Sequence, residues 1–325
     1  MASSRSEILE WAEAGHIAPQ NVRRALESGA VLPTAGEWRR FLDRLLLFMG
    51  VAMLAAGIIF FLAYNWHELG RFAKFGLVEA SMLVALACVW WLGLEHAAGK
   101  AALLAVALLT GALLALVGQT YQTGADSFEL FTAWAIAILP WALVARFPAL
   151  WALWLVIVNL AITLYFQVFH GWFGIVFGPE RQLWLLFWFN MTALAVWEAS
   201  AALGLGWLRE RWAPRLIATA GGTFVSVLAV IAVINWKSAS GSNVLVWLVW
   251  LGAMYAVYRH RIKDVYMLAG GVLSLIAVVT AFLAKQLIHH GAGEASGFLL
   301  VGLIVIGMSA AGAYWLKIVA REDDR

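Results

Sequence analysis

The sequence predicts an all-helical, polytopic membrane protein: a bundle of about ten transmembrane helices preceded by a short helical segment in the cytoplasm. Its 325 residues are 63% hydrophobic and only 13% charged, with a mean hydropathy of +0.84. A soluble domain is about 45–50% apolar and about 25% charged. Apolar windows of about 20 residues, enough for one helix to cross a bilayer, recur along the chain. The polar surface is too small to coat a water-soluble globule, which excludes the soluble enzyme classes.

Residues 1–44 are polar and predict short cytoplasmic helices. Thr34-x-x-Glu37 is the pattern of a capping box, and the apolar stripe after it predicts a helix that continues into the first span. Arg23 and Arg24 would suit a helix-turn-helix that reads DNA, but the segment is short and its charges are mixed. We therefore expect no nucleic-acid partner and place these basic residues against anionic lipid.

Ten apolar windows predict a transmembrane bundle over 45–316, followed by a cytoplasmic tail over 317–325. The windows are 45–64, 75–94, 101–118, 130–146, 150–169, 183–203, 215–235, 243–258, 264–284 and 297–316. The fourth and the eighth are short. Pro140 in the fourth is tolerable, because neighbouring helices can satisfy the carbonyl that it frees.

The basic residues predict the orientation of the bundle, since Lys and Arg collect in cytoplasmic loops. With the N-terminus in the cytoplasm, 17 of the 22 Lys and Arg residues fall on the cytoplasmic side and 5 on the other. This split favours an even number of spans with both termini in the cytoplasm.

Polar side chains gather at two of the predicted outer loops, after the first and the third span. They are Asn65, Trp66, Gln119, Tyr121, Gln122 and Asp126. One interpretation is an interfacial turn in which Asp126 caps the next helix. The other is a rim of hydrogen-bonding groups that holds a polar ligand at the mouth of a cavity.

These loops also resemble a known family. The Asn65-Trp66 span end, the Gly118-Gln119-x-Tyr121-Gln122 loop with Asp126, and Trp134 are similar to the bacterial family of predicted membrane proteins named domain of unknown function 2157. Leu9-x-Trp11-x3-Gly15-x-Ile17 resembles the cytoplasmic start of that family. The resemblance covers residues 5–150. It implies a bacterial cytoplasmic (inner) membrane and supplies no activity.

An internal echo predicts a repeat. Asn235-Trp236 ends the seventh span as Asn65-Trp66 ends the first, and Gln286-x4-Gly291-Ala292 follows the ninth as Gln119-x4-Gly124-Ala125 follows the third. Spans one to four (45–146) and seven to ten (215–316) are therefore candidate parallel repeats, with 150–203 as a connecting pair of spans. Such a repeat would place Asn65, Gln119 and Asp126 around one cavity with Asn235, Gln286 and Glu294.

Two acidic residues lie inside predicted spans, where ionisable groups are costly. Glu79 could pair with Arg71 or Lys74, and Glu198 with Arg209 or Arg211. We favour such pairing over a proton relay. Two small-residue series predict close helix packing: Ala107-x3-Gly111-x3-Ala115 and Ala218-x3-Gly222-x3-Ser226.

Motifs for catalysis and cofactors are missing from the sequence. Cys88 is the single cysteine, so a thiolate metal site is excluded. His289-His290-x3-Glu294 has the residue types of a metal site, but adjacent histidines diverge unless the loop bends. We expect no catalytic residues, no metal and no cofactor.

Three functions fit these observations, and the sequence does not decide whether the protein is an enzyme. The first is a transporter or permeability protein for a small polar or amphipathic solute, which predicts a cavity that reaches the midplane. The second is a non-catalytic subunit or scaffold for a membrane or periplasmic partner, which predicts a filled bundle. The third, ranked last, is an integral membrane enzyme on envelope or lipid-linked substrates, which predicts converging acidic or histidine groups.

Overall fold

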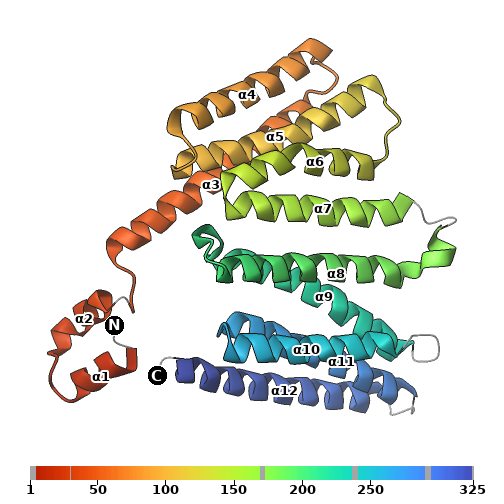
Figure 1. Ribbon diagram of the computed structural model, residues 1–325. Coiled ribbons are helices and arrows are strands. Elements are labelled where there is room, and N and C mark those ends of the chain that lie inside the picture. Colours follow the sequence, from red (N-terminus) through yellow and green to blue (C-terminus); the bar gives the residue numbers. More distant parts are fainter. Residues whose placement is uncertain (1–4, 30, 169–172, 236–240, 290–293, 324–325) are drawn as a thin grey trace. The chain divides into compact units, whose positions relative to one another are not determined.

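A computed structural model describes the chain except for residues 1–4, 30, 169–172, 236–240, 290–293 and 324–325. Every regular element among the described residues is helical, which confirms the predicted class (Figure 1). The helices are α1 (Arg5–Glu13), η1 (Pro19–Asn21), α2 (Val22–Ser28), α3 (Ala35–Tyr64), α4 (Arg71–Leu92), α5 (Ala97–Tyr121), α6 (Ser127–Ala145), α7 (Pro148–Val168), α8 (Phe173–Ala202), η2 (Gly206–Leu208), α9 (Trp212–Ile234), α10 (Ser242–His260), α11 (Val265–His289) and α12 (Glu294–Asp323).

Nine of the described helices, α3 to α9, α11 and α12, are long and apolar enough to cross a membrane. They account for nine of the ten predicted windows. The remaining window, 243–258, forms α10, which is not among the nine because its 19 residues include two Trp, two Tyr and polar residues at both ends. Helix α3 begins directly after Thr34 and runs unbroken through the first span, as the capping pattern predicts.

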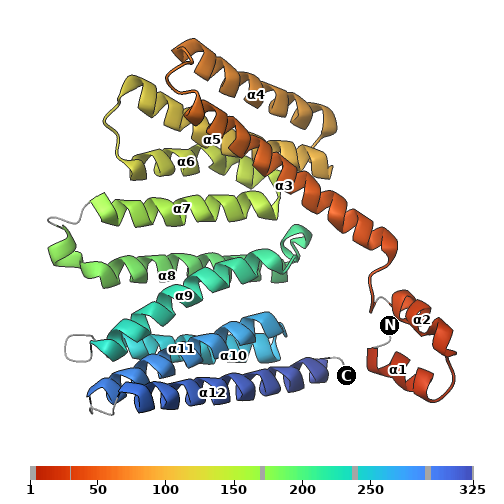
Figure 2. The same ribbon diagram turned by 180° about the vertical axis from the view of Figure 1, so that it is seen from behind.

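The described chain divides into two compact units, and each is described by itself. The first comprises Ala35–Gln182 and Trp197–Ala213. Within it, α5 contacts α3, α4, α6 and α7, and it lies between α4 and α6 in both views (Figures 1 and 2). Many of the buried residues of α5 are small, which lets neighbouring helices approach closely.

Gly111 confirms the predicted packing series in this unit. A methyl group on Gly111 would lie 2.5 Å from the Trp134 ring of α6, so the glycine makes room for that ring. The Trp134 Nε1–H donates a hydrogen bond to the Ala107 carbonyl, at 2.7 Å. The small residues of α5 therefore accept a large ring together with its polar atom.

The second unit comprises Met1–Thr34, Leu183–Val196 and Pro214–Arg325. Two polar contacts show that α9 and α11 run parallel. Arg215 and Asp264 form an ion pair of 3.1 Å at the start of both helices, and the Lys285 Nζ donates to the Val233 carbonyl at 2.8 Å near their ends. Helix α10 connects them and runs in the opposite direction.

The C-terminal ends of α10 and α12 lie close together. Arg259 of α10 forms an ion pair with Glu322 of α12, and the rings of Tyr255 and Trp315 stack with their centroids 6.2 Å apart. Helices α10 and α12 therefore run in the same direction and end together.

Candidate ligand-binding pocket

The predicted polar loop after α5 lines a cavity. Gln119, Gln122 and Asp126 lie in the wall of a cavity of about 550 Å³ between the end of α5 and the start of α6. Gln122 has a left-handed backbone (φ 46°) and its N–H donates to the Gly118 carbonyl, which ends α5. The structure thus brings three of the predicted residues together.

Asp126 also caps α6, as one of the two interpretations of this loop predicts. It forms a capping box with Glu129, whose carboxylate accepts a hydrogen bond from the Asp126 N–H at 3.1 Å. The pattern Asp126-x-x-Glu129 could have been found in the sequence. A role for Asp126 in binding a ligand stays a prediction.

Asn65, Trp66 and Tyr121 lie near the same end of α3 and α5 but outside the described lining of that cavity. The Asn65 Nδ2 donates to the Phe61 carbonyl of its own helix at 2.9 Å. The Lys74 Nζ lies 3.7 Å from the centroid of the Trp66 ring. Tyr121 is exposed. These groups already have local partners or face outward.

The predicted residues of the other unit are only partly described. Asn235 and Gln286 are exposed at the ends of α9 and α11, which the Lys285 hydrogen bond places at the same end of the unit. His290 and the side chains of His289 and Glu294 lie outside the described residues. Among the residues that are described, no three His, Cys, Asp or Glu side chains form a group able to hold a metal. One cavity shared by both sets stays a prediction.

The two acidic residues inside the predicted spans, Glu198 and Glu79, differ in whether they form an ion pair. Glu198 pairs with Arg211, whose Nη1 donates to both carboxylate oxygens at 2.9 and 3.0 Å, as the pairing interpretation expects. Glu79 is exposed on α4, and within the described part of the chain the structure shows no ion pair for it. The cations expected beside it contact aromatic rings instead: Arg71 lies over Phe72 and Lys74 over Trp66.

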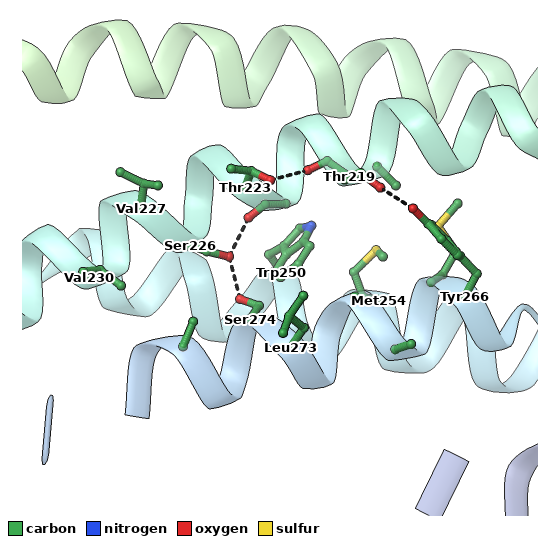
Figure 3. Close-up of a pocket in the computed structure, with 16 residues that line it drawn as sticks. Thr219, Thr223, Ser226, Val227, Val230, Trp250, Met254, Tyr266, Leu273 and Ser274 are labelled. Carbon is green, nitrogen blue, oxygen red and sulfur yellow. Dashed lines mark hydrogen bonds between the residues drawn. The ribbon is translucent and has the colours of Figure 1, made fainter. Parts of the chain in front are cut away.

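A second cavity, of about 530 Å³, lies in the second unit between α9, α10 and α11 (Figure 3). We call it the α9–α11 pocket. It is lined by Ala218, Thr219, Gly222, Thr223, Ser226, Val227, Val230, Trp250, Met254, Tyr266, Met267, Ala269, Gly270, Leu273, Ser274 and Ala277. Gly222 makes room for Trp250, because a methyl group there would lie 2.9 Å from its ring. The volume falls within the range of about 300–1,000 Å³ typical of small-molecule sites.

A row of hydroxyl groups runs along one wall of this pocket. Thr219, Thr223 and Ser226 stand at helical spacing on α9, and each donates a hydrogen bond to the carbonyl four residues earlier. The Thr219 hydroxyl lies 3.0 Å from the Tyr266 hydroxyl, and the Ser226 hydroxyl 2.6 Å from that of Ser274 (Figure 3). The pocket is therefore apolar with one polar edge.

Trp250 lines the pocket and carries a buried indole N–H. Its Nε1 is buried and has no hydrogen-bond partner among the described residues. In Figure 3 its ring stands between α9 and α11, with the nitrogen toward α9. A buried polar group left without a partner costs about 1–3 kcal/mol.

Charged groups lie just beyond one end of the pocket. Arg215 precedes Thr219 by one helical turn, and its Cζ lies 5.5 Å from the centroid of the Tyr266 ring. The Asp264 side chain is only 2% exposed; it accepts from the Arg215 Nε through Oδ2 and from the Tyr266 N–H through Oδ1. Asp264 thus fixes both Arg215 and the start of α11.

Sequence reasoning did not identify this pocket. It assigned Gly222 and Ser226 to helix packing, which is right for Gly222 against Trp250. The available signal was Thr219, Thr223 and Ser226 at positions i, i+4 and i+7 of one apolar span. Their convergence with Tyr266 and Ser274 depends on contacts across 47 and 48 residues.

The described fold and cavities define a polytopic helical membrane protein with a pocket of ligand size among its apolar helices. The model of the family described as predicted membrane protein (DUF2157) matches residues 9–151, which confirms the resemblance over that segment. The match runs from α1 into α7, and the α9–α11 pocket lies outside it. No curated protein and no solved structure matches the chain.

Proposed function

We propose that the protein is a transport or permeability protein of the bacterial inner membrane, and that its solute is small and amphipathic. The observation that carries the proposal is the α9–α11 pocket. From Ala218 to Val230 it follows α9 over 13 residues, whose ends lie about 18 Å apart at about 1.5 Å per residue. It includes Thr223, the middle residue of α9. A pocket in this position supports binding at the bilayer midplane.

The lining supports an amphipathic solute. Apolar side chains such as Val227, Met254 and Leu273 would bury hydrocarbon, and the hydroxyl row would meet one or two polar atoms. Ligand sites commonly combine apolar walls with a few polar groups that fix orientation. A strongly hydrated solute would leave most of its polar atoms without partners here.

The topology belongs to the same proposal. Helix α10 ends level with α12 and runs beside α11, so we take it as a tenth span although it is less apolar. Its 19 residues cover about 28 Å, close to the thickness of the hydrocarbon core. With ten spans the basic residues favour both termini in the cytoplasm.

The α5–α6 cavity keeps its predicted role as a polar rim on the outer side. Gln119 is exposed in its wall and has no partner among the described residues that would occupy its amide. Under this proposal Gln119→Ala slows solute passage and leaves binding in the α9–α11 pocket unchanged. Equal transport by the variant and the wild type would reduce the loop to a turn.

Filling the pocket tests the proposal. A Cβ on Gly270 would meet no atom within 4 Å, and Gly270 lines the pocket, so Gly270→Leu should occupy part of the pocket. The probe is dansyl-undecanamide, an uncharged amphipath, titrated into protein in phosphatidylcholine nanodiscs with empty nanodiscs as the blank. The wild type should enhance dansyl fluorescence saturably, and Gly270→Leu should weaken binding at least tenfold.

Gly302→Leu is the matched control. Gly302 lies in α12, is exposed, has open space around it and is not part of the pocket. The control should bind the probe as the wild type does. Equal binding by all three proteins would refute the pocket as a ligand site. The passage of an NBD-labelled single-chain lipid across proteoliposomes, followed with dithionite, then tests transport; wild-type rates equal to those of protein-free vesicles would favour a binding subunit.

A further inference from the structure

The charged end of the α9–α11 pocket indicates which amphipath it takes. Resting on the pocket proposed above, we infer that the ligand carries an anionic head group, a phosphate or a carboxylate, which Arg215 binds beside Tyr266. The hydrocarbon tail then lies along α9 toward Val230.

Arg215 is held by one hydrogen bond, and its other guanidinium N–H groups remain available as donors. Its Nε donates to Asp264 at 3.1 Å, and its two terminal nitrogens form no other hydrogen bond within the described residues. The Arg215 side chain is 40% exposed while that of Asp264 is 2% exposed. The buried carboxylate therefore orients the guanidinium, whose outer edge remains open. A guanidinium presents parallel N–H groups that match a carboxylate or phosphate.

The charge balance of this end is positive in spite of Asp264. Arg261 and Lys263 lie in the short connection between α10 and α11, directly before Asp264. Two further cations are therefore close in the chain to a carboxylate that is already paired with Arg215. Basic pockets at the cytoplasmic ends of transmembrane helices bind anionic lipid head groups. The proposed topology places this end in the cytoplasmic leaflet, where such head groups are available.

The position of Arg215 relative to the pocket joins head and tail in one site. Thr219 follows Arg215 by one turn on the same face of α9, and its hydroxyl meets that of Tyr266 at the edge of the pocket. A head group on Arg215 would thus have its first chain atoms at Thr219 and Tyr266. The remaining chain would pass Trp250 and the hydroxyl of Ser226.

Two probes that differ in one group test this inference. Dansyl-undecanoic acid and dansyl-undecanamide have the same chain and fluorophore, and only the first is anionic. In phosphatidylcholine nanodiscs, corrected against empty nanodiscs, the wild type should bind the acid about tenfold more tightly than the amide, because a charge-assisted hydrogen bond is worth about one factor of ten or more. Equal affinity for both probes would overturn the inference.

Variants of the ion pair assign the preference to Arg215. Asp264→Asn keeps the helix cap and the guanidinium, and should retain or strengthen the preference for the acid. The double variant Arg215→Gln/Asp264→Asn removes both charges without leaving one of them unpaired, and should lower acid binding to that of the amide. A preference for the acid that survives in the double variant would refute the role of Arg215.

Two further measurements distinguish an amphipathic anion from a soluble one, and failure of the pocket proposal from failure of the head-group inference. Inorganic phosphate at millimolar concentration should not displace the acid, because it has no tail; displacement would identify a soluble anion instead. Gly270→Leu should weaken both probes. If it weakens neither, the pocket itself fails. If it weakens both while the double variant leaves the preference for the acid unchanged, only the head-group inference fails.

Discussion

Adding a single methyl group to Gly111 should destabilise the first unit, because the site is filled by the Trp134 ring. The new Cβ would lie 2.5 Å from that ring, whereas ordinary contacts begin at 3.4 Å, so the ring must retreat by about 1 Å. The ring is also held by the hydrogen bond of its Nε1–H to the Ala107 carbonyl. Its retreat would strain or break that bond.

The magnitude follows from three contributions. Overpacking a filled site costs about 1–3 kcal/mol, and losing the Trp134 hydrogen bond adds about 1 kcal/mol. Replacing glycine with alanine inside a helix returns up to about 1 kcal/mol. We therefore expect Gly111→Ala to lower the stability by about 1–3 kcal/mol.

The assay is thermal unfolding in detergent at a fixed scan rate, followed by the loss of monodisperse protein. A loss of 1 kcal/mol corresponds to about 2–4 °C for a domain of 150–250 residues, so Gly111→Ala should melt several degrees lower. Gly118→Ala on the same helix is the control, because its Cβ would lie 3.8 Å from the Thr123 Oγ1, an ordinary contact. A melting temperature for Gly111→Ala at or above that of Gly118→Ala would refute this packing.

Three further predictions use the same measurement. Asp126→Ala removes the cap of α6 and should cost about 1 kcal/mol, whereas Asp126→Asn, which can still cap, should cost much less. Glu198→Ala removes the carboxylate that accepts two hydrogen bonds from the Arg211 Nη1 and should cost about 1–3 kcal/mol, below the value for a fully buried pair because both side chains are partly exposed. Glu198→Leu/Arg211→Met should restore most of the loss. Trp247→Phe removes the indole donor to the Ser274 hydroxyl, 2.9 Å away, and should cost about 1 kcal/mol.

The fold could be predicted from the sequence because a helix that crosses the hydrocarbon core of a bilayer must be apolar and about 20 residues long. Nine predicted windows coincide with helices long and apolar enough to span, and the capping pattern at Thr34 located the start of α3. The eighth window, 243–258, showed the limit of the rule. In α10 several of the residues that lower hydropathy, among them Trp247, Trp250 and Tyr258, are buried.

The sites were harder to predict because they depend on which helices meet. The expected partners of Glu79 were close in sequence, yet Lys74 lies over the Trp66 ring instead. The α9–α11 pocket requires Ser226 to meet Ser274 across 48 residues, and a single sequence carries no sign of that pairing. By contrast, the partner of Glu198 is local, and the sequence was enough to name Arg211 among two candidates.

The hydroxyl row of α9 also bears on how the protein is made. Thr219, Thr223 and Ser226 each donate to a carbonyl of their own helix, so a newly inserted α9 exposes none of these donors to lipid. The contacts with Tyr266 and Ser274 can only form later, when α11 has entered the bilayer. During synthesis α9 can therefore remain in the membrane as a stable single helix. The pocket forms only after α11 has been inserted and has packed against it.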